Sequence, residues 1–223
     1  MLQVRHRRLQ TLLWRRAEPP FAGRWALPGG PLRPDELLGA CVARQLAENV
    51  DVREIAHLEQ LETRSDPDRD PRGRHLATAY LGLVPAGADP PLPADTAWHP
   101  ADDLPPSAFD HGSLVASGVA RLRAKLSYTN LGFALAPEVF TIAELRDLYA
   151  AALGHPVTAT NLQRVLLRRG VLESTGQTAG PGRAGGRPAA LHRFRSSALQ
   201  VTDPFAVLRP RGPTSGPRRD GPA

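Results

Sequence analysis

Charge is distributed unevenly along this chain, and any fold that the chain adopts has to accommodate that asymmetry. Residues 1–127 carry 16 basic and 16 acidic side chains, whereas residues 128–223 carry 12 basic and 6 acidic ones. The whole net charge of +6 therefore lies after position 127. At 223 residues the chain is long enough for two domains that each bury a core. We expect a neutral domain followed by a basic one that meets a polyanion such as nucleic acid. Composition alone leaves open that the arginines only reflect a GC-rich genome.

Composition excludes several other classes of protein. Hydrophobic residues make up 41% and charged residues 22% of the chain, as in globular proteins. Cys41 is the single cysteine, so no intramolecular disulfide can form, and no Cys/His cluster has zinc spacing. No apolar run approaches membrane-spanning length, and the basic amino terminus lacks the apolar core of a signal peptide. We expect a cytoplasmic protein without a metal, a cofactor or a membrane contact.

Periodicity in the first half predicts a domain of mixed α and β structure over residues 1–126. Apolar runs bounded by turn residues predict strands, and apolar residues at four-residue steps predict helices. The expected elements are strands at 9–14, near Trp25 and at 76–84, and amphipathic helices over 35–49 and 111–125.

The second half predicts a helix-turn-helix followed by a wing, over residues 127–206. Thr141 and Glu144 have the spacing of a capping box that opens a helix, which Gly154 and Pro156 end. A second helix over 158–169 follows. Short strands at 171–175 and 189–194 flank a glycine-rich loop, as in the wing of a winged helix. The Pro/Gly/Arg-rich tail, residues 207–223, is expected to be disordered.

One motif in the first half has a fixed spacing. It reads Gly30-x5-Glu36-x7-Arg44-Gln45-Leu46-x-Glu48-Asn49-x-Asp51-Val52. This pattern resembles the Nudix box, although Asp51 replaces the glycine of the box. The Leu27-Pro28-Gly29-Gly30 run, the Asp/Arg-rich run at 66–74 and the stretch from Trp98 to His111 resemble the ADP-ribose pyrophosphatase branch of that family. The resemblance implies a Nudix fold, a mixed sheet between helices, over roughly residues 1 to 125.

Two carboxylates of the Nudix box are missing. The family has Glu at positions 45 and 49, where this chain has Gln45 and Asn49, and only Glu48 and the more peripheral Glu36 remain. Mg²⁺ prefers anionic oxygens, and an amide cannot act as a general base. We therefore predict little or no hydrolysis and no catalytic residue. Glu59 and Glu62 are the alternative source of replacement carboxylates.

If hydrolysis is lost, the pocket of the domain can persist as a sensor of the nucleotide that related enzymes cleave. The fold-level resemblance implies Trp25, Arg44 and Arg74 as residues that contact this effector. Trp25 can equally belong to the core. Arg44 in this family orients a box carboxylate, and we favour a structural ion pair with Glu48 over contact with a ligand.

Four runs in the second half of the chain resemble a known winged-helix domain. The runs 128–130, 136–145, 153–156 and 185–194 resemble the winged-helix half of the Nudix-related transcriptional regulators of NAD metabolism, the NrtR family. Residues 160–195 contain seven arginines and one acidic residue. We expect Asn161, Arg164 and Arg168 to form one helical stripe that reads the major groove, and the wing residues Arg183 and Arg187 to contact phosphates or the minor groove.

Together these features predict an α+β protein, a Nudix-fold mixed-sheet domain followed by a winged helix-turn-helix domain. The resemblance implies a homodimeric repressor of NAD-related genes that binds double-stranded DNA and responds to ADP-ribose or a similar nucleotide. We expect residues 111–127 to couple the two functions. The main alternative is an active Nudix hydrolase of the ADP-ribose pyrophosphatase type with an accessory basic domain. A third is that the basic half binds RNA or another protein.

Overall fold

The computed structural model describes residues 1–180 and 188–203. The first domain is built on a six-stranded sheet in the order β3-β2-β1-β5-β4, with β6 paired to β2. β1 and β5 run parallel and the other pairs are antiparallel. The strands are β1 (Leu2–Arg5), β2 (Arg8–Arg15), β3 (Trp25–Ala26), β4 (His57–Arg64), β5 (Ala77–Leu83) and β6 (Thr96–Pro100).

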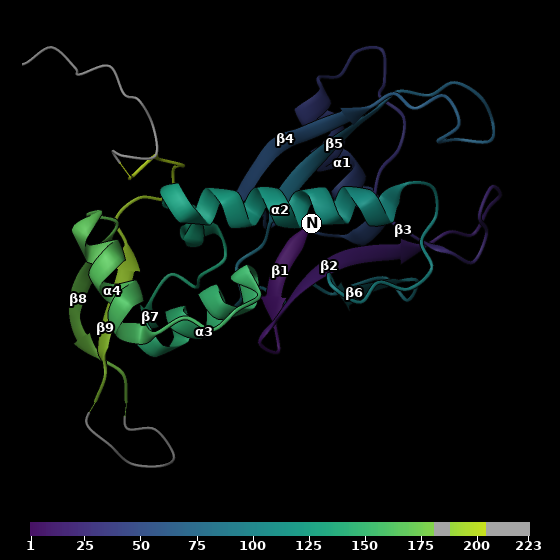
Figure 1. Cartoon of the computed structure of the whole chain (residues 1–223). Coiled ribbons are helices and arrows are strands. Elements are labelled where there is room, and N and C mark those ends of the chain that lie inside the picture. The colour runs from purple at the N-terminus through teal and green to yellow at the C-terminus, as the bar shows by residue number, and fades with distance from the viewer. Residues whose placement is uncertain (181–187, 204–223) are drawn as a thin grey trace, which may run out of the picture.

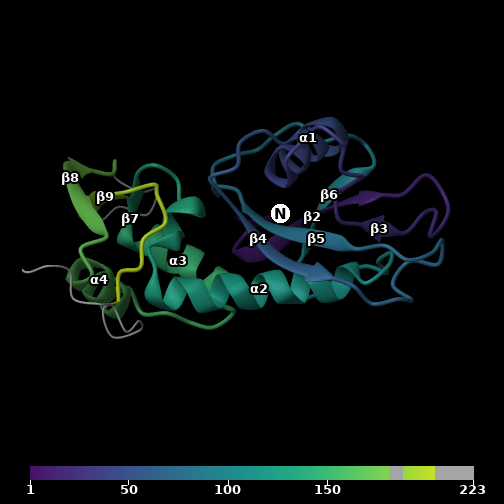
Figure 2. The same ribbon diagram turned by 90° about the horizontal axis from the view of Figure 1, so that it is seen from above.

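Two helices cover the opposite faces of this sheet. α1 (Leu38–Val50) lies on one face and the long helix α2 (His111–Tyr128) on the other, as Figure 2 shows. The mixed sheet between helices confirms the predicted fold. α1 ends at Asp51, which takes the left-handed conformation with φ 51° at the position where the box has glycine.

Three strands of the first domain were not predicted. β1 and β2 form a hairpin whose two-residue turn, His6 and Arg7, has φ of 49° and 62°. Such turns favour Asn and Gly, so a basic turn carries little sequence signal. β4 is rich in charged residues, and β6 lies within a proline-rich stretch.

The second domain has the predicted order of a winged helix. Its elements are η1 (Leu131–Ala134), β7 (Phe140–Thr141), α3 (Ile142–Leu153), α4 (Ala159–Arg168), β8 (Leu172–Thr178) and β9 (Ala190–Phe194), with β9 at the centre of the three-stranded sheet. The capping box is confirmed, because Thr141 and Glu144 each bond the other's backbone N–H. Gly154 ends α3 with φ 78°. Parts of the glycine-rich loop, with Arg183 and Arg187, and the 207–223 tail lie outside the described residues.

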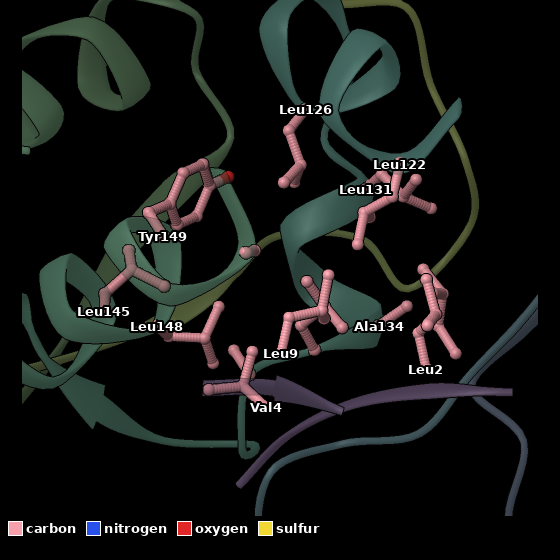
Figure 3. Close-up of a cluster of buried hydrophobic side chains, with 14 of the residues drawn as sticks. Leu2, Val4, Leu9, Leu122, Leu126, Leu131, Ala134, Leu145, Leu148 and Tyr149 are labelled. Carbon is pink, nitrogen blue, oxygen red and sulfur yellow. The ribbon is translucent and has the colours of Figure 1, made fainter. Parts of the chain in front are cut away.

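One hydrophobic cluster joins the two domains. Val4 and Leu9 of the β1–β2 hairpin lie towards Leu148 of α3, and Leu2 lies on the side of α2 and η1 (Figure 3). α2 runs unbroken across the junction, so the expected boundary at 126/127 falls in its last turn. Figure 1 shows α2 extending from the first domain to the winged helix. The orientation of the two domains is therefore held by buried apolar contacts and not by a free linker.

The long helices of the fold are amphipathic. Within residues 1–180 and 188–203, no helix is both long and apolar enough to cross a membrane.

Candidate effector pocket and nucleic-acid interface

A cavity of about 1020 Å³ opens in the first domain between α1, β5 and the first turn of α2. Gln45 and Leu46 of α1 form one wall, and His111 and Leu114 of α2 form part of another. The loop that precedes β5 closes a third side. Small-molecule sites are commonly of this size and are lined mainly by apolar side chains with a few polar groups.

Gln45 of the cavity wall bonds to Asn49, one turn further along α1. Nδ2 of Asn49 donates to Oε1 of Gln45 at 2.7 Å, as the i, i+4 spacing on a helix allows. Gln45 is buried and packs over Gly30, where a Cβ would collide with the side-chain amide of Gln45. Only glycine fits at position 30 with this arrangement. The two side-chain amides therefore satisfy one another on α1.

The remaining box carboxylates are held by Arg44. Its Nε donates to Glu36 at 2.9 Å and its Nη1 donates to Glu48 at 3.1 Å. The pair with Glu36 includes a second, very short contact. The hydrogen bonds from Arg44 hold the pKa of Glu36 at about 2, well below its usual range. The expected Arg44–Glu48 contact is present, and Glu36 is a further partner of Arg44 that was not predicted.

These groups do not fit a magnesium ion. In the described part of the chain, no group of three or more His, Cys, Asp or Glu side chains is placed to hold a metal. Glu59 and Glu62 cannot complete such a set, because they lie on β4. There Glu59 pairs with Lys125 of α2, and Glu62 pairs with Arg64, which also bonds Ser117 of α2. α1 lies on the opposite face of the sheet (Figure 2).

Three arginines border the cavity, and we call Arg16, Arg69 and Arg72 the arginine rim. Arg69 pairs with Asp110 at 2.7 Å and is 7% exposed. Arg72 pairs with the buried Asp70 at 2.7 Å, and this pairing lowers the pKa of Asp70 well below its usual range. The guanidiniums of Arg16 and Arg72 lie 5.1 and 5.8 Å from the ring centroid of Phe109. The rim thus combines positive charge with an aromatic face.

His111 adds a neutral polar group to the same wall. Its Nδ1 accepts a hydrogen bond from the backbone N–H of Leu27 at 2.9 Å. Burial lowers the pKa of His111 to about 4, so the imidazole is uncharged at neutral pH. The histidine therefore anchors the loop before α1 to the first turn of α2 without adding charge.

The second candidate site is the outer face of α4. Asn161, Arg164 and Arg168 are exposed, while Leu162 and Leu166 are buried against the rest of the winged helix. Nη2 of Arg164 donates to Oδ1 of Asn161 at 2.8 Å on this exposed face. The predicted stripe therefore exists as one solvent-facing surface on the second helix of the helix-turn-helix.

Comparisons with known proteins agree with both halves of this architecture. Residues 2–117 match the NUDIX domain, and residues 132–194 match the NrtR DNA-binding winged helix domain. The chain is 34% identical to a protein of Acinetobacter baylyi named ADPR responsive transcriptional repressor NtrR, over 91% of this chain and 82% of that protein. The chain belongs to the NrtR family.

Solved structures of a family member are similar to this one. The crystal structure of Shewanella oneidensis NrtR with a 27mer DNA has 33% sequence identity and a TM-score of 0.73, and the match covers 87% of this chain and 90% of that one. The NUDIX domain of the same protein with ADP ribose has 33% identity and a TM-score of 0.50, over 54% of this chain and 82% of that one.

The NrtR fold places the predicted effector residues outside the cavity wall. Trp25 packs against His99 with ring centroids 4.3 Å apart, Arg44 bonds the box carboxylates, and Arg74 is exposed. Within the described residues, none of the three borders the cavity. Their contact with an effector stays a prediction. The arginine rim, Phe109 and His111 were not singled out, although Arg69, Arg72 and His111 lie in stretches with a visible family resemblance.

Proposed function

We propose that this chain is a transcriptional repressor of NAD-related genes that binds DNA through α4 and binds ADP-ribose, or a related nucleotide, in the cavity without hydrolysing it. One observation supports this most directly. A single chain combines a NUDIX cavity, whose metal-ligand positions are amides bonded to each other, with an exposed helix face of arginine and asparagine. A non-hydrolytic pocket and a DNA-reading surface are the two parts that a ligand-responsive repressor requires.

The cavity suits a nucleotide with a diphosphate. The arginine rim offers positive charge for phosphate oxygens, and Phe109 offers an aromatic face. Arg69 and Arg72 are paired with carboxylates. Arg16 differs from them, because it donates to the main-chain carbonyls of Pro20 and Glu18, which leave its charge uncancelled. We assign Arg16 the largest share of phosphate binding.

The box helix argues against catalysis. Hydrolysis in Nudix enzymes needs a magnesium site, and the amide pair of Gln45 and Asn49 together with the Arg44-bound carboxylates does not provide one. Bound ADP-ribose would therefore persist and report its own concentration. This separates our proposal from the alternative of an active hydrolase.

On the DNA side, we expect Asn161, Arg164 and Arg168, which are exposed on α4, to contact base edges. Arg183 and Arg187, from the loop between β8 and β9, would contact the backbone or the minor groove. We propose that the protein acts in the cytoplasm as a homodimer on an operator with two-fold symmetry.

Fluorescence anisotropy on labelled promoter fragments from the organism's own NAD-biosynthesis genes tests the proposal, at fixed salt and with or without ADP-ribose. Specific binding that ADP-ribose shifts is the expected result. Specific binding indifferent to ADP-ribose would remove the effector from the proposal. Absence of specific binding, or Mg²⁺-dependent release of AMP from ADP-ribose at enzymatic rates, would overturn it.

A further inference from the structure

Helix α2 lines the cavity at one end and reaches the winged helix, which carries the second candidate site, at the other. His111 and Leu114 in its first turns line the cavity. Its C-terminal half is fastened to the sheet, where Arg121 donates to the carbonyl of Leu61 at 3.2 Å and Lys125, in the last turn, pairs with Glu59 of β4. Its last turns reach the winged helix (Figure 1). A helix that contacts the cavity and the domain that carries α4 is placed to transmit a displacement from one to the other.

Among the residues that the structure describes, Arg123 makes one of two polar contacts between α2 and the helix-turn-helix. Its Nε donates to the carbonyl of Ala152 in the last turn of α3 at 3.2 Å. Gly154, the next residue but one, has φ 78°, and a Cβ there would lie 2.5 Å from Nη2 of Arg123. The guanidinium therefore lies against the turn between α3 and α4. It satisfies a carbonyl that the helix end leaves free.

The second contact comes from the other side of that turn. Arg169 directly follows α4, and its Nη2 donates to the carbonyl of Ser127 in the last turn of α2 at 2.5 Å. The same nitrogen contacts a carboxylate oxygen of Asp203 at 3.1 Å. The Arg169 side chain is only 12% exposed. Unlike Arg164 and Arg168, it points away from the DNA-facing stripe and into the junction.

The segment after the wing completes this junction, and we call residues 195–203 the strap. Asn130 is 2% exposed, and its side chain donates to the carbonyl of Ala198 at 2.9 Å and accepts from the N–H of Gln200 at 2.7 Å. The backbone N–H groups of Thr202 and Asp203 donate to the carbonyl of Tyr128. The strap thus holds Asp203 beside Arg169. Asn130 is therefore an internal group that ties the strap to the start of the second domain.

We propose that Arg169 is a positioning residue that fixes α4 to the last turn of α2, so that the state of the cavity at one end of α2 sets the orientation of α4 at the other. Arg123 holds α3 to the same part of α2. The strap keeps Asp203, the carboxylate partner of Arg169, in place. This inference rests on the proposed function, because it assigns the route by which a cavity ligand changes DNA affinity.

The test compares Arg169→Gln and Arg169→Lys with the control Arg168→Gln in the full-length protein. Anisotropy gives the DNA Kd with and without ADP-ribose, and calorimetry gives the ADP-ribose Kd. Couplings of this kind are about 5–150-fold. We expect Arg169→Gln to bring the ratio of the two DNA Kd values to within about twofold of one, while the ADP-ribose Kd is unchanged. Arg169→Lys, which keeps the charge, should retain part of the ratio.

Arg168→Gln should weaken DNA binding and leave the ratio as in the wild type, because Arg168 faces outward from the junction. A wild-type ratio in Arg169→Gln would overturn the inference. A purely structural role for Arg169 would weaken DNA binding equally with and without ADP-ribose, and would also count against it.

Amide hydrogen exchange separates this inference from the proposed function. If wild-type DNA binding does not respond to ADP-ribose, the proposed effector fails, but the junction can still be tested. The inference then requires faster exchange in Arg169→Gln at both the last turn of α2 and α4, with the exchange of α1 unchanged. Faster exchange confined to α4, or none at all, would overturn it.

Discussion

Helices α1 and α4 carry similar polar side chains but use them in opposite ways. On α1, Arg44 pairs with two box carboxylates, and the amides of Gln45 and Asn49 bond to each other. On α4, the stripe that contains Asn161 and Arg164 faces solvent, and its single described internal bond joins those two exposed side chains. A Nudix box is normally the reactive helix of its domain, yet here it is the helix whose polar groups are already engaged.

The contrast shows that residue type on a helix face does not by itself define a site. A new partner of α1 would have to break the part-buried hydrogen bonds of Arg44 with Glu36 and of Asn49 with Gln45, and each break leaves a polar group unsatisfied. A new partner of α4 only replaces water and one exposed contact. We therefore assign α1 to the architecture of the cavity and α4 to recognition of an external ligand.

The largest expected effect comes from replacing the two amides of α1 by carboxylates. In the double variant Gln45→Glu and Asn49→Glu, two carboxylates join Glu48 on one helix face, and Mg²⁺ should bind. Restoring a general base contributes about 10²–10⁴-fold in rate, so we expect Mg²⁺-dependent release of AMP from ADP-ribose at least at that level above the wild type. Coupled AMP detection and Mn²⁺ titration measure the two steps.

The matched control is Gln45→Ala with Asn49→Ala, which breaks the amide pair without adding charge and should remain inactive. If the wild type bound metal as tightly as the double glutamate variant, or hydrolysed ADP-ribose as fast, the polar groups of α1 would not be engaged as described. The contrast with α4 would then be lost.

The next effect is the pH dependence of stability that the uncharged His111 in the cavity wall should cause. Because the pKa of His111 is lowered from 6.5 to about 4, the unfolded chain binds a proton between these pH values that the folded chain does not. The free energy of unfolding should therefore be fully supported above about pH 6.5 and should fall as the pH drops toward 4. The shift corresponds to about 3 kcal/mol.

Urea unfolding of the wild type and of His111→Gln, at several pH values between 7 and 4, isolates this contribution. Glutamine can still accept from the N–H of Leu27 but does not titrate. Parallel pH dependence in the two proteins would show that His111 is accessible to protons in the folded state.

A smaller effect is expected for base recognition by α4. Arg164→Ala should cost about 1–3 kcal/mol in operator binding and relax the preference at one base pair. Anisotropy on the operator and on single-base variants of it measures both changes. Arg193→Ala is the control, because Arg193 pairs with Glu173 across β8 and β9 and lies off α4. An equal loss on every DNA sequence would assign Arg164 to the phosphate backbone.

Sequence reasoning predicted the helices better than the strands. Four-residue apolar spacing predicted α1 and α2, and the Thr141 capping box and the glycines after each helix predicted α3 and α4. The strands that sequence reasoning missed lacked such local signals. The β1–β2 turn consists of His6 and Arg7, and β4 is stabilised by its pairing with β5. Tertiary pairing overrides local propensity in strands of this kind.

The candidate site was harder to predict, because its members are assembled from distant segments. Arg16, Arg69 and His111 belong to three separate loops or helix ends, and no spacing along the chain indicates that they meet. The stripe on α4 was predictable, because its members share one helix. The bond between Gln45 and Asn49 also follows from i, i+4 spacing, but the two residues were interpreted only as lost metal ligands.

The smallest expected effect is that of Arg183→Ala, in the wing, on DNA binding. Arg183 lies outside the described residues, so the prediction depends on its position in the glycine-rich sequence between β8 and β9. A phosphate contact there carries no base information. Arg183→Ala should therefore weaken operator and unrelated DNA alike, and should reduce the slope of log K against log salt by about 1. Titrations at several salt concentrations, on both DNAs, measure the slope. If Arg183→Ala instead changed specificity while Arg164→Ala changed only the slope, the wing would be the reading element and α4 would be the positioning one.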